Sequence, residues 1–371
     1  MKVLFLANIP SPYRVDFFNE LGKYCDLTVI YERITADDRD RKWEWDNAQN
    51  YKEFFLKGIN IGVDSAICLD IVKWLKPNKF DLIIVGGYST PTGMLAIQTL
   101  KLRKIPFILN CDGGFIKNDK KIIYKIKRYF ISNATWWLST GNEASKYLSY
   151  YGANENNIFI YPFSSLKDKD IIKTAISKKT KKNIRSELNI VDEYVAISVG
   201  RYIKSKGYDT LIKSWRNIDK NYKLLIIGSG EEEEALKQLI EENYLSNIEL
   251  IGFKKKEELR KYYLAADFFI LPTRSDVWGL VINEAMACGL PIITTDKCIA
   301  GKELIDNYIN GFVIPVDDEE ILAEKADYLF KNENIVISMA NENLKRVSLY
   351  TIEEMAKSHI RIFEQILEVN K

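Results

Sequence analysis

The chain has 371 residues, is 47% hydrophobic and 28% charged, and carries a formal net charge of +2 at pH 7. This length exceeds what one hydrophobic core usually supports, and the composition excludes a disordered chain, so two folded domains are predicted. The small charge, with a mild basic excess in residues 1–165, argues against a nucleic-acid partner and favours a local anionic one.

The cysteines and the apolar runs bear on the cellular compartment. The five cysteines are odd in number and show no CxxC spacing, which favours free thiols in a reducing compartment over disulfides or zinc. The first apolar run is too short for a signal peptide, and no stretch reaches the roughly 18 apolar residues of a spanning helix. We therefore expect a cytoplasmic protein.

Short apolar runs alternate with amphipathic segments along the chain, which predicts parallel strands joined by crossover helices. A first series of strands is expected at residues 3–7, 27–31, 82–85, 107–109 and 135–138. A second series is expected at residues 195–199, 224–227, 248–251, 268–271 and 291–294. The predicted fold class is α/β, with two Rossmann-like parallel-sheet domains facing each other across a cleft.

The predicted domain boundaries follow from changes in composition. Residues 1–165 form the first domain, and the lysine-rich residues 166–190 form a linker with the helix that leads into the second domain. Residues 191–350 form the second domain, and residues 351–371 form an amphipathic helix that can pack back on either domain. Ligands of open parallel sheets bind beyond the carboxyl ends of the strands, so the loops there are expected to carry the chemistry.

Residues 117–132 are predicted to form a basic amphipathic helix. Its apolar stripe contains Ile122, Ile123, Ile126, Tyr129 and Phe130, and a second stripe contains Lys121, Lys125 and Arg128. Such a helix can lie against anionic lipid, with about 1 kcal/mol per surface cation. It can also be a crossover helix with its apolar stripe in the core, which is favoured for most of the stripe. The helix can be both a crossover helix and a lipid-binding helix if its apolar stripe lies in the core and the cations alone contact lipid.

The loop after the predicted strand 268–271 is the most informative segment. Pro272 ends the strand, and a helix is expected to begin near Gly279. The free amides at that helix start favour an anion, and Gly279 leaves room for a phosphate. Glu284 in the second turn suits a ribose diol, while Asp276 lies on the loop. The alternatives are a turn or capping role for Asp276 and a surface position for Glu284.

The loop after the predicted strand 195–199 carries positive charge. Arg201 and Lys206 are placed to reach a diphosphate, and their charge would stabilise a departing nucleotide diphosphate. The alternative is that these are solvated loop cations, which we favour for Lys204.

These segments together resemble the donor domain of glycosyltransferase family 4. The resemblance lies in Gly200-Arg201, Lys206-Gly207, Gly228-Ser229-Gly230, Gly252-Phe253 and the run from Asp276 to Ile293, within about residues 195–315. It implies the GT-B fold, transfer from nucleotide-sugar donors with retention of anomeric configuration, and no metal or other cofactor.

The resemblance also implies residue roles. Arg201 and Lys206 would hold the donor diphosphate, and Glu284 would hold the ribose. The remaining donor-binding candidates are Gly252, Phe253, Asp276, Trp278, Gly279 and Leu280. Asp276 stands where the family usually has glutamate, which puts its contact with the donor sugar in question, and Trp278 stands where phenylalanine is common.

The first domain resembles bacterial surface-polysaccharide transferases in three loops that follow strands. Arg14, Tyr88, Asp112 and Gly113 are candidate acceptor-binding residues, although the glycines of these loops can simply make tight turns. The family often has a histidine in its acceptor-side loop, but His359 in the terminal helix is the one histidine of this chain. We therefore expect His359 to be a packing or surface residue and Asp112 to be its catalytic substitute.

The expected function is retaining transfer of a hexosyl or N-acetylhexosaminyl group from a UDP-sugar to a glycan acceptor. The acceptor is expected to be lipid-linked, in capsule or O-antigen synthesis at the inner membrane face. Asp276, Asp112, Arg201 and Lys206 are the catalytic candidates, with no protein nucleophile. The alternatives are a nucleotide-sugar 2-epimerase of the same fold, against which the position of His359 speaks, and a non-catalytic nucleotide-sugar-binding protein.

Overall fold

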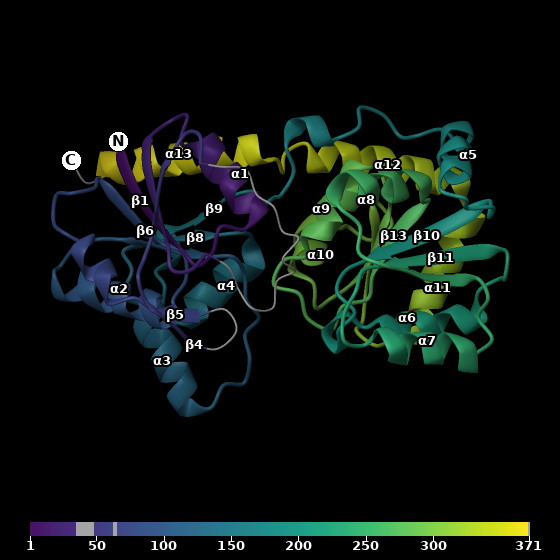
Figure 1. Cartoon of the computed structure of the whole chain (residues 1–371), viewed down its shortest axis with the longest axis horizontal. Coiled ribbons are helices and arrows are strands. Elements are labelled where there is room, and N and C mark those ends of the chain that lie inside the picture. Colours follow the sequence, from purple (N-terminus) through teal and green to yellow (C-terminus); the bar gives the residue numbers. More distant parts are fainter. Residues whose placement is uncertain (35–47, 62–64, 370–371) are drawn as a thin grey trace. The chain divides into compact units, whose positions relative to one another are not determined.

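The structure is a computed structural model that describes residues 1–34, 48–61 and 65–369. Close contacts divide the chain into two compact units, Met1–Ser165 with Thr351–Lys371, and Leu166–Tyr350 (Figure 1). Residues 166–190 thus lie within the second unit. There the buried Arg185 of α5 (Lys178–Glu187) donates from Nε to the carbonyl oxygen of Ala265 at 2.7 Å. In the described ranges, no helix has both the length and the apolar character needed to cross a bilayer.

The first unit contains a seven-stranded sheet whose pairings are all parallel. In spatial order its strands are β3 (Lys52–Phe55), β2 (Asp26–Tyr31), β1 (Lys2–Ala7), β6 (Leu82–Val85), β7 (Ile108–Cys111), β8 (Trp136–Ser139) and β9 (Ile158–Ile160). The strand order reverses between β1 and β6. A separate antiparallel pair joins β4 (Ile59–Ile61) and β5 (Ser65–Ile67).

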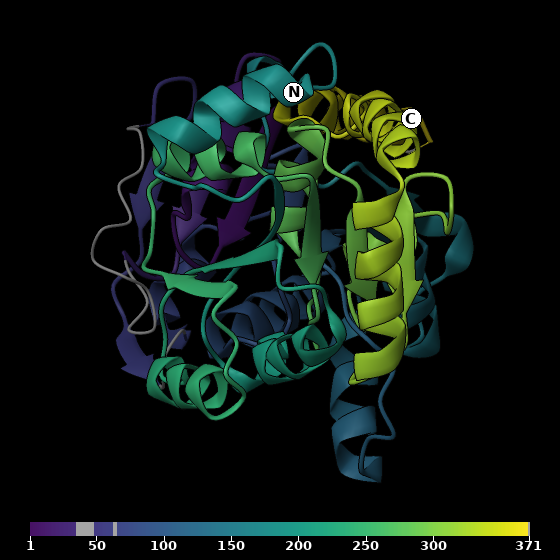
Figure 2. The same cartoon turned by 90° about the vertical axis from the view of Figure 1, so that its right-hand side faces the viewer.

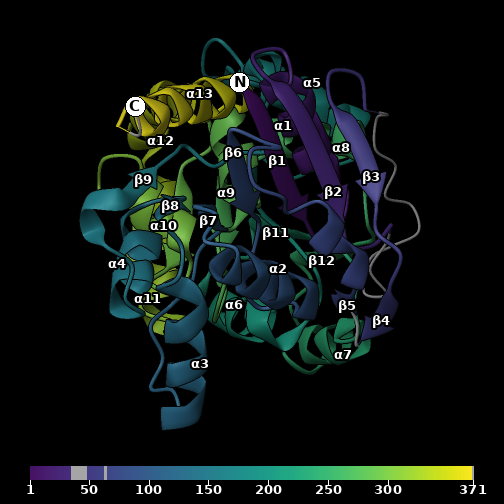
Figure 3. The same cartoon turned by 90° about the vertical axis from the view of Figure 1, so that its left-hand side faces the viewer.

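Helices cover both faces of this sheet (Figure 3). On one face lie α1 (Pro12–Leu21) and α13 (Ile352–Val369), and Phe18 of α1 packs on Phe5 of β1 with ring centres 5.0 Å apart. On the other face lie α2 (Pro91–Leu102), α3 (Lys121–Ile131) and α4 (Asn142–Tyr150). Buried residues of these three helices share one apolar cluster with β1, β6 and β7, so the core of the unit has two layers.

The second unit contains a six-stranded parallel sheet. In spatial order its strands are β12 (Ile248–Ile251), β11 (Tyr222–Ile227), β10 (Tyr194–Val199), β13 (Phe268–Leu271), β14 (Ile292–Thr295) and β15 (Gly311–Ile314). Tyr194 pairs with Tyr222 on one side of β10, and Ala196 pairs with Phe268 on the other. The strand order reverses between β10 and β13, which makes this pair the topological switch point.

Two groups of helices cover the second sheet (Figure 2). The first group shares an apolar cluster with the strands and contains α6 (Tyr208–Ser214), α7 (Glu233–Glu242) and α11 (Glu319–Lys331). The opposite face carries α8 (Lys256–Ala265) and α9 (Leu280–Ala287), and Tyr263 of α8 meets Phe269 with ring centres 6.0 Å apart. The shorter α10 (Ile299–Leu304) and the long α12 (Glu333–Val347) pack on α9.

The α/β fold with two parallel sheets is confirmed, and the ten predicted strands are all present within two residues of their expected bounds. The strands that the apolar pattern does not predict include β3, β9 and β15, which lie at sheet edges. All four residues of β3 are exposed. An edge strand with solvated side chains lacks the apolar run that marks a buried parallel strand.

Candidate active site

The loops after β10 and β13 lie in backbone contact at the switch point of the second sheet. Gly207, in the first loop, has a φ of 70°, and a β carbon there would lie 2.1 Å from the carbonyl oxygen of Pro272 in the second loop. Any other residue would separate the two loops, so glycine is required here on two grounds. The contact brings together two segments that the sequence assigned to one phosphate-binding site.

Lys206 and Asp276 meet where these loops touch. The Lys206 ammonium forms an ion pair with Asp276 Oδ2, and the two side chains are 16% and 17% exposed. Asp276 Oδ1 accepts a hydrogen bond of 3.3 Å from the backbone N–H of Trp278. Its backbone N–H donates to the carbonyl oxygen of Lys297 at 2.9 Å. Two predicted catalytic residues from two different loops are therefore neighbours at the switch point.

Arg274 joins the same two loops, a role that the sequence did not reveal. Its backbone N–H donates to Ser205 at 2.7 Å, and its Nη1 donates to the carbonyl oxygen of Lys204 at 2.7 Å. The guanidinium also contacts Asp209 and Asp317 at 2.8 Å each. Hydrogen bonds to these two carboxylates raise the pKa of Arg274. The signal in the sequence was an arginine beside Asp276, but its partners lie up to 70 residues away.

The start of α9 follows this loop, as predicted. Gly279 has a φ of 96°, and a β carbon there would lie 2.7 Å from Cys298 Sγ. The Trp278 side chain is 3% exposed, and its indole N–H donates to Asn283 at 2.9 Å. The Trp278 side chain therefore supports the loop, while Gly279 and Leu280 present the first backbone groups of the helix.

Glu284 sits in the second turn of α9 and is partly buried. The buried phenol of Tyr263 lies 3.3 Å from Glu284 Oε2 and donates to it. Burial, with the nearby Glu284 charge, raises the pKa of Tyr263 well above its usual value, so the phenol stays a donor. A carboxylate oriented by a buried hydroxyl fits the ribose role better than the alternative of a surface glutamate.

The other donor-binding candidates follow strands of the same sheet edge. Arg201 is the second residue after β10 and is exposed. Gly252 follows β12 with open space at its β-carbon position, and the Phe253 side chain is 42% exposed. A β carbon at Gly228 would lie 1.9 Å from the carbonyl oxygen of Gly200, so the ends of β10 and β11 approach each other closely.

In the first unit, Arg14 and Asp112 form an ion pair at the carboxyl edge of the sheet. Arg14 from α1 contacts both carboxylate oxygens through Nη2. Arg14 is 8% exposed and Asp112, which follows β7, is 35% exposed. Burial lowers the pKa of Arg14, but the charge and hydrogen bond of Asp112, together with Tyr13 and Tyr161, outweigh burial, and the pKa is raised. Gly113 follows with a φ of 134°, a conformation that favours glycine.

Tyr88 belongs to a different polar group of the first unit. Its hydroxyl bonds the Tyr147 hydroxyl of α4, and burial is the main reason that the pKa values of both phenols are raised. Asp119 pairs with Lys127 of α3 at 2.8 Å and also accepts from Tyr151. The structure thus joins Arg14 to Asp112 and places Tyr88 with α4.

The terminal helix holds His359 in the interior of the first unit. The side chain is 0% exposed, and its ring lies 4.5 Å from the Tyr161 ring and 4.7 Å from the Phe17 ring, centre to centre. Burial, with a smaller contribution from the charge of Arg14, lowers the pKa of His359 to about 4. Of the packing and surface positions that the sequence left open, His359 occupies the packing one.

Helix α3 differs from the favoured sequence interpretation. Ile131 is the one buried residue of the helix, whereas Ile122, Ile123 and Ile126 are 68%, 41% and 46% exposed. The helix contacts its own unit through Phe130, which packs against the apolar cluster, and through Lys127, which pairs with Asp119. The expectation that most of the apolar stripe lies in the core is wrong, because the helix turns that stripe outward. Lys121, Lys125 and Arg128 are exposed beside it.

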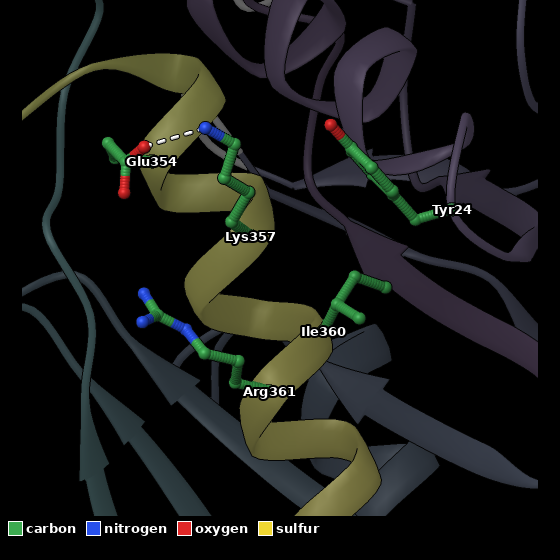
Figure 4. Close-up of a pocket in the computed structure, with 5 residues that line it drawn as sticks. All are labelled: Tyr24, Glu354, Lys357, Ile360 and Arg361. Atoms are coloured by element: carbon green, nitrogen blue, oxygen red, sulfur yellow. Dashed lines mark hydrogen bonds and ion pairs between the residues drawn. The ribbon is translucent and has the colours of Figure 1, made fainter.

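A pocket of about 300 Å³ lies on the polar side of α13 in the first unit. It is lined by Tyr24, Glu354, Lys357, Ile360 and Arg361 (Figure 4). Glu354 and Lys357 pair across one helical turn at 2.8 Å. None of the predicted site residues lines this pocket, so it is separate from the candidate site.

Two units with parallel sheets and this loop geometry define an α/β fold of the GT-B class. The family model of glycosyl transferases group 1 matches residues 180–346. An uncharacterized glycosyltransferase of Haemophilus influenzae is 30% identical over 74% of this chain and 73% of its own length. The chain therefore belongs to the group 1 glycosyltransferases.

Two further proteins resemble the chain. The capsular polysaccharide biosynthesis glycosyltransferase CapM of Staphylococcus aureus is 31% identical over 53% of this chain and 52% of its own length. The crystal structure of Anabaena HepE in complex with UDP superposes with a TM-score of 0.76 and 15% identity, covering 100% of this chain and 99% of that chain. The similarity to the HepE structure shows that the same fold covers the whole chain.

Proposed function

We propose that the protein is a retaining transferase of family 4 that moves a hexosyl or N-acetylhexosaminyl group from a UDP-sugar to a glycan acceptor. The observation that carries this proposal is the ion pair of Lys206 with Asp276, beside the start of α9 and the Glu284 carboxylate. Cations, helix amides and a ribose-binding carboxylate are the groups that a nucleotide diphosphate requires.

In the proposed reaction, the bond from the anomeric carbon to the diphosphate oxygen breaks as the acceptor oxygen attacks the same face of the sugar. The acceptor proton passes to the departing phosphate oxygen, so neither a protein nucleophile nor a metal takes part. Arg201 and Lys206 stabilise the charge that develops on the diphosphate. Asp276, one methylene shorter than the usual glutamate, accepts a hydrogen bond from a hydroxyl of the donor sugar.

Ligand binding must reorganise the pair that these residues form. Lys206 contacts Asp276 in the structure. A diphosphate brings negative charge to Lys206, so the ammonium shifts towards the phosphates and Asp276 is released towards the sugar. The diphosphate therefore competes with Asp276 for Lys206, and the donor sugar competes with Lys206 for Asp276.

The comparisons support the choice of donor and pathway. HepE is described in complex with UDP, and CapM acts in capsular polysaccharide biosynthesis. By extension, we infer a UDP-sugar donor and a role in a surface polysaccharide such as capsule or O-antigen. In the first unit, Arg14, Tyr88, Asp112 and Gly113 are the proposed acceptor-binding residues, with Asp112 as the group that approaches the reacting carbon.

The exposed face of α3 supports a lipid-linked acceptor and peripheral attachment to the cytoplasmic face of the membrane. Exposed isoleucines lie beside Lys121, Lys125 and Arg128, and Asp119, the acidic residue just before the helix, is paired with Lys127. An apolar face next to cations is the surface that an anionic bilayer binds. Lipid contact would thus involve the isoleucines as well as the cations.

The test is a panel of uridine and guanosine diphosphates and their sugars, scored by thermal shift and then by product analysis. Stabilisation by UDP and transfer of sugar with the donor's anomeric configuration are expected. Interconversion of the free nucleotide sugar would identify an epimerase, and binding with neither transfer nor hydrolysis would identify a sensor. An inverted product would remove the retaining mechanism.

A further inference from the structure

Three segments of the first unit converge on the Asp112 carboxylate. Arg14 reaches it from α1, and Asn110 at the end of β7 donates from Nδ2 to Asp112 Oδ1 at 2.8 Å. The Tyr161 hydroxyl, which follows β9, lies 3.3 Å from Oδ1 and 3.1 Å from Asn110 Oδ1. Asn110 and Tyr161 are 1% and 0% exposed. A buried polar shell therefore surrounds a carboxylate that is itself partly exposed.

The two oxygens of Asp112 are used unequally. Oδ1 accepts from Arg14 and Asn110 and shares the one Tyr161 O–H proton with Asn110 Oδ1, whereas Oδ2 accepts from Arg14 alone within the described ranges. A carboxylate oxygen can accept two hydrogen bonds, so Oδ2 keeps capacity for another donor. Burial, with the Asp112 charge, raises the pKa of Tyr161 well above its usual value and keeps its hydroxyl a donor. The shell thus fixes Oδ1 and leaves Oδ2 for a ligand.

The terminal helix α13 forms the wall behind Tyr161. The His359 ring lies 4.5 Å from the Tyr161 ring at an angle of 58°. His359 Nδ1 donates to the carbonyl oxygen of Met355 at 2.8 Å, since a carbonyl cannot donate, and this bond fixes the ring. His359 does not reach the surface, so it can influence a ligand only through its neighbours, and its shortest ring contact is with Tyr161.

We propose that Asn110, Tyr161 and His359 are positioning residues that hold Asp112 Oδ2 towards an acceptor hydroxyl, with His359 acting through Tyr161. The C-terminal helix then completes the acceptor side of the site, although it begins 240 residues after Asp112 in sequence. This inference rests on the proposed function, because it assigns the acceptor contact to Asp112.

The experiment compares Tyr161→Phe, His359→Ala and the double variant, with UDP-glucose as donor and octyl glucoside as acceptor. Each single variant is expected to lower kcat/KM for the acceptor about tenfold, because a carboxylate held by fewer bonds is poorly oriented. The donor KM and the thermal shift with UDP should stay unchanged. Because His359 acts through Tyr161, the kcat/KM of the double variant should be little lower than that of the less active single variant.

Ile366→Ala is the matched control, since Ile366 lies two turns further along α13 and is also buried. It should lower the thermal stability without changing the acceptor KM. Losses that multiply in the double variant would overturn the role of His359. An unchanged acceptor kcat/KM in Tyr161→Phe would overturn the proposal while leaving the transferase assignment intact, whereas wild-type protein without transfer or UDP binding would remove the proposed function itself.

A second measurement needs no acceptor. His359 is the one histidine of the chain, so its ring gives a single Cε1–Hε1 signal in an NMR spectrum. Tyr161→Phe and Asp112→Asn should both shift this signal if the shell is one connected unit. A signal that is unmoved in Asp112→Asn would contradict the connection between α13 and the carboxylate.

Discussion

Helices α3 and α13 are both amphipathic, yet the first unit buries the apolar stripe of only one of them. On α13, Met355, His359 and Phe363 are 0% exposed, and the helix packs along α1. On α3, the isoleucines of the stripe are exposed and Ile131 alone is buried. An amphipathic pattern therefore predicts that a stripe exists, while the neighbouring elements decide whether protein covers it. The comparison predicts opposite consequences for substitutions in the two stripes.

The largest effect is expected for Phe363→Ala in α13. Removing a fully buried aromatic ring leaves a cavity, and such substitutions cost about 3–5 kcal/mol of unfolding free energy. Urea unfolding of the whole chain, followed by circular dichroism, measures this loss. Ile126→Ala in α3 is the matched substitution on an exposed stripe, and its cost should stay within about 0.5 kcal/mol. Equal costs in the two helices would refute the assignment of their stripes.

The next effect concerns pH and depends on the buried His359 of α13. Arg14, Asp112 and Tyr161 face this ring, and burial, together with the charge of Arg14, lowers the pKa from 6.5 to about 4. The unfolded chain then binds a proton between these pH values and the folded chain does not, so stability is complete above pH 6.5 and falls towards pH 4. The loss reaches about 3 kcal/mol, at roughly 1.4 kcal/mol per pKa unit.

Urea unfolding at pH 7.0, 6.0 and 5.0 for the wild type and His359→Leu isolates this loss. Carboxylates titrate in both proteins, so the difference between the two curves reports the histidine. The difference should shift in favour of the variant as the pH falls. Parallel curves would show that His359 is protonated as readily in the folded chain as in the unfolded one. Helix α3 has no histidine, and its variants should follow the wild-type curve.

The third effect tests what covers the α3 stripe. Replacing Lys121, Lys125 and Arg128 by serine should weaken binding to anionic vesicles about 100-fold at low salt, at about 1 kcal/mol per cation. Replacing Ile122, Ile123 and Ile126 by serine should weaken it about tenfold or more, with a loss that persists at high salt because apolar burial is not screened. Vesicle co-sedimentation at two salt concentrations separates the two contributions.

Both α3 variants should unfold at nearly the wild-type urea concentration, because their side chains are exposed. Vesicles of neutral lipid are the control for the charge contribution. Binding that depends on the cations alone would leave the exposed isoleucines without a partner. Unchanged sedimentation of both variants would remove the membrane surface from the proposal.

The sequence predicts the central strands and the loops at their carboxyl ends because buried parallel strands are short apolar runs. It predicts that Lys206 and Asp276 belong to one site, because both follow strands at the switch point of the sheet. It does not predict the partners of Arg274 or the packing of His359 on Tyr161, because these contacts join residues far apart in the chain. Likewise, nothing in the local sequence of α3 shows whether its apolar stripe is buried in the core or exposed at the surface.

The smallest change in free energy is expected in the second unit, at the Lys206–Asp276 pair, which belongs to neither α3 nor α13. Asp276→Asn removes the negative charge that holds Lys206, so UDP should bind about fivefold more tightly, about 1 kcal/mol for a partly exposed pair. Sugar transfer should be lost, because the amide no longer accepts the sugar hydroxyl as a carboxylate does. Isothermal titration with UDP and the transfer assay measure the two consequences.

Lys206→Gln is the complementary variant and should lose UDP affinity, while Phe363→Ala and the α3 variants should bind UDP as the wild type does. Full turnover in Asp276→Asn would contradict the role of this carboxylate at the donor sugar. Unchanged UDP affinity with lost transfer would mean that the diphosphate binds without drawing Lys206 from Asp276. The ion pair would then be part of the occupied site, and the phosphate charge would have to be met by Arg201 and the first amides of α9.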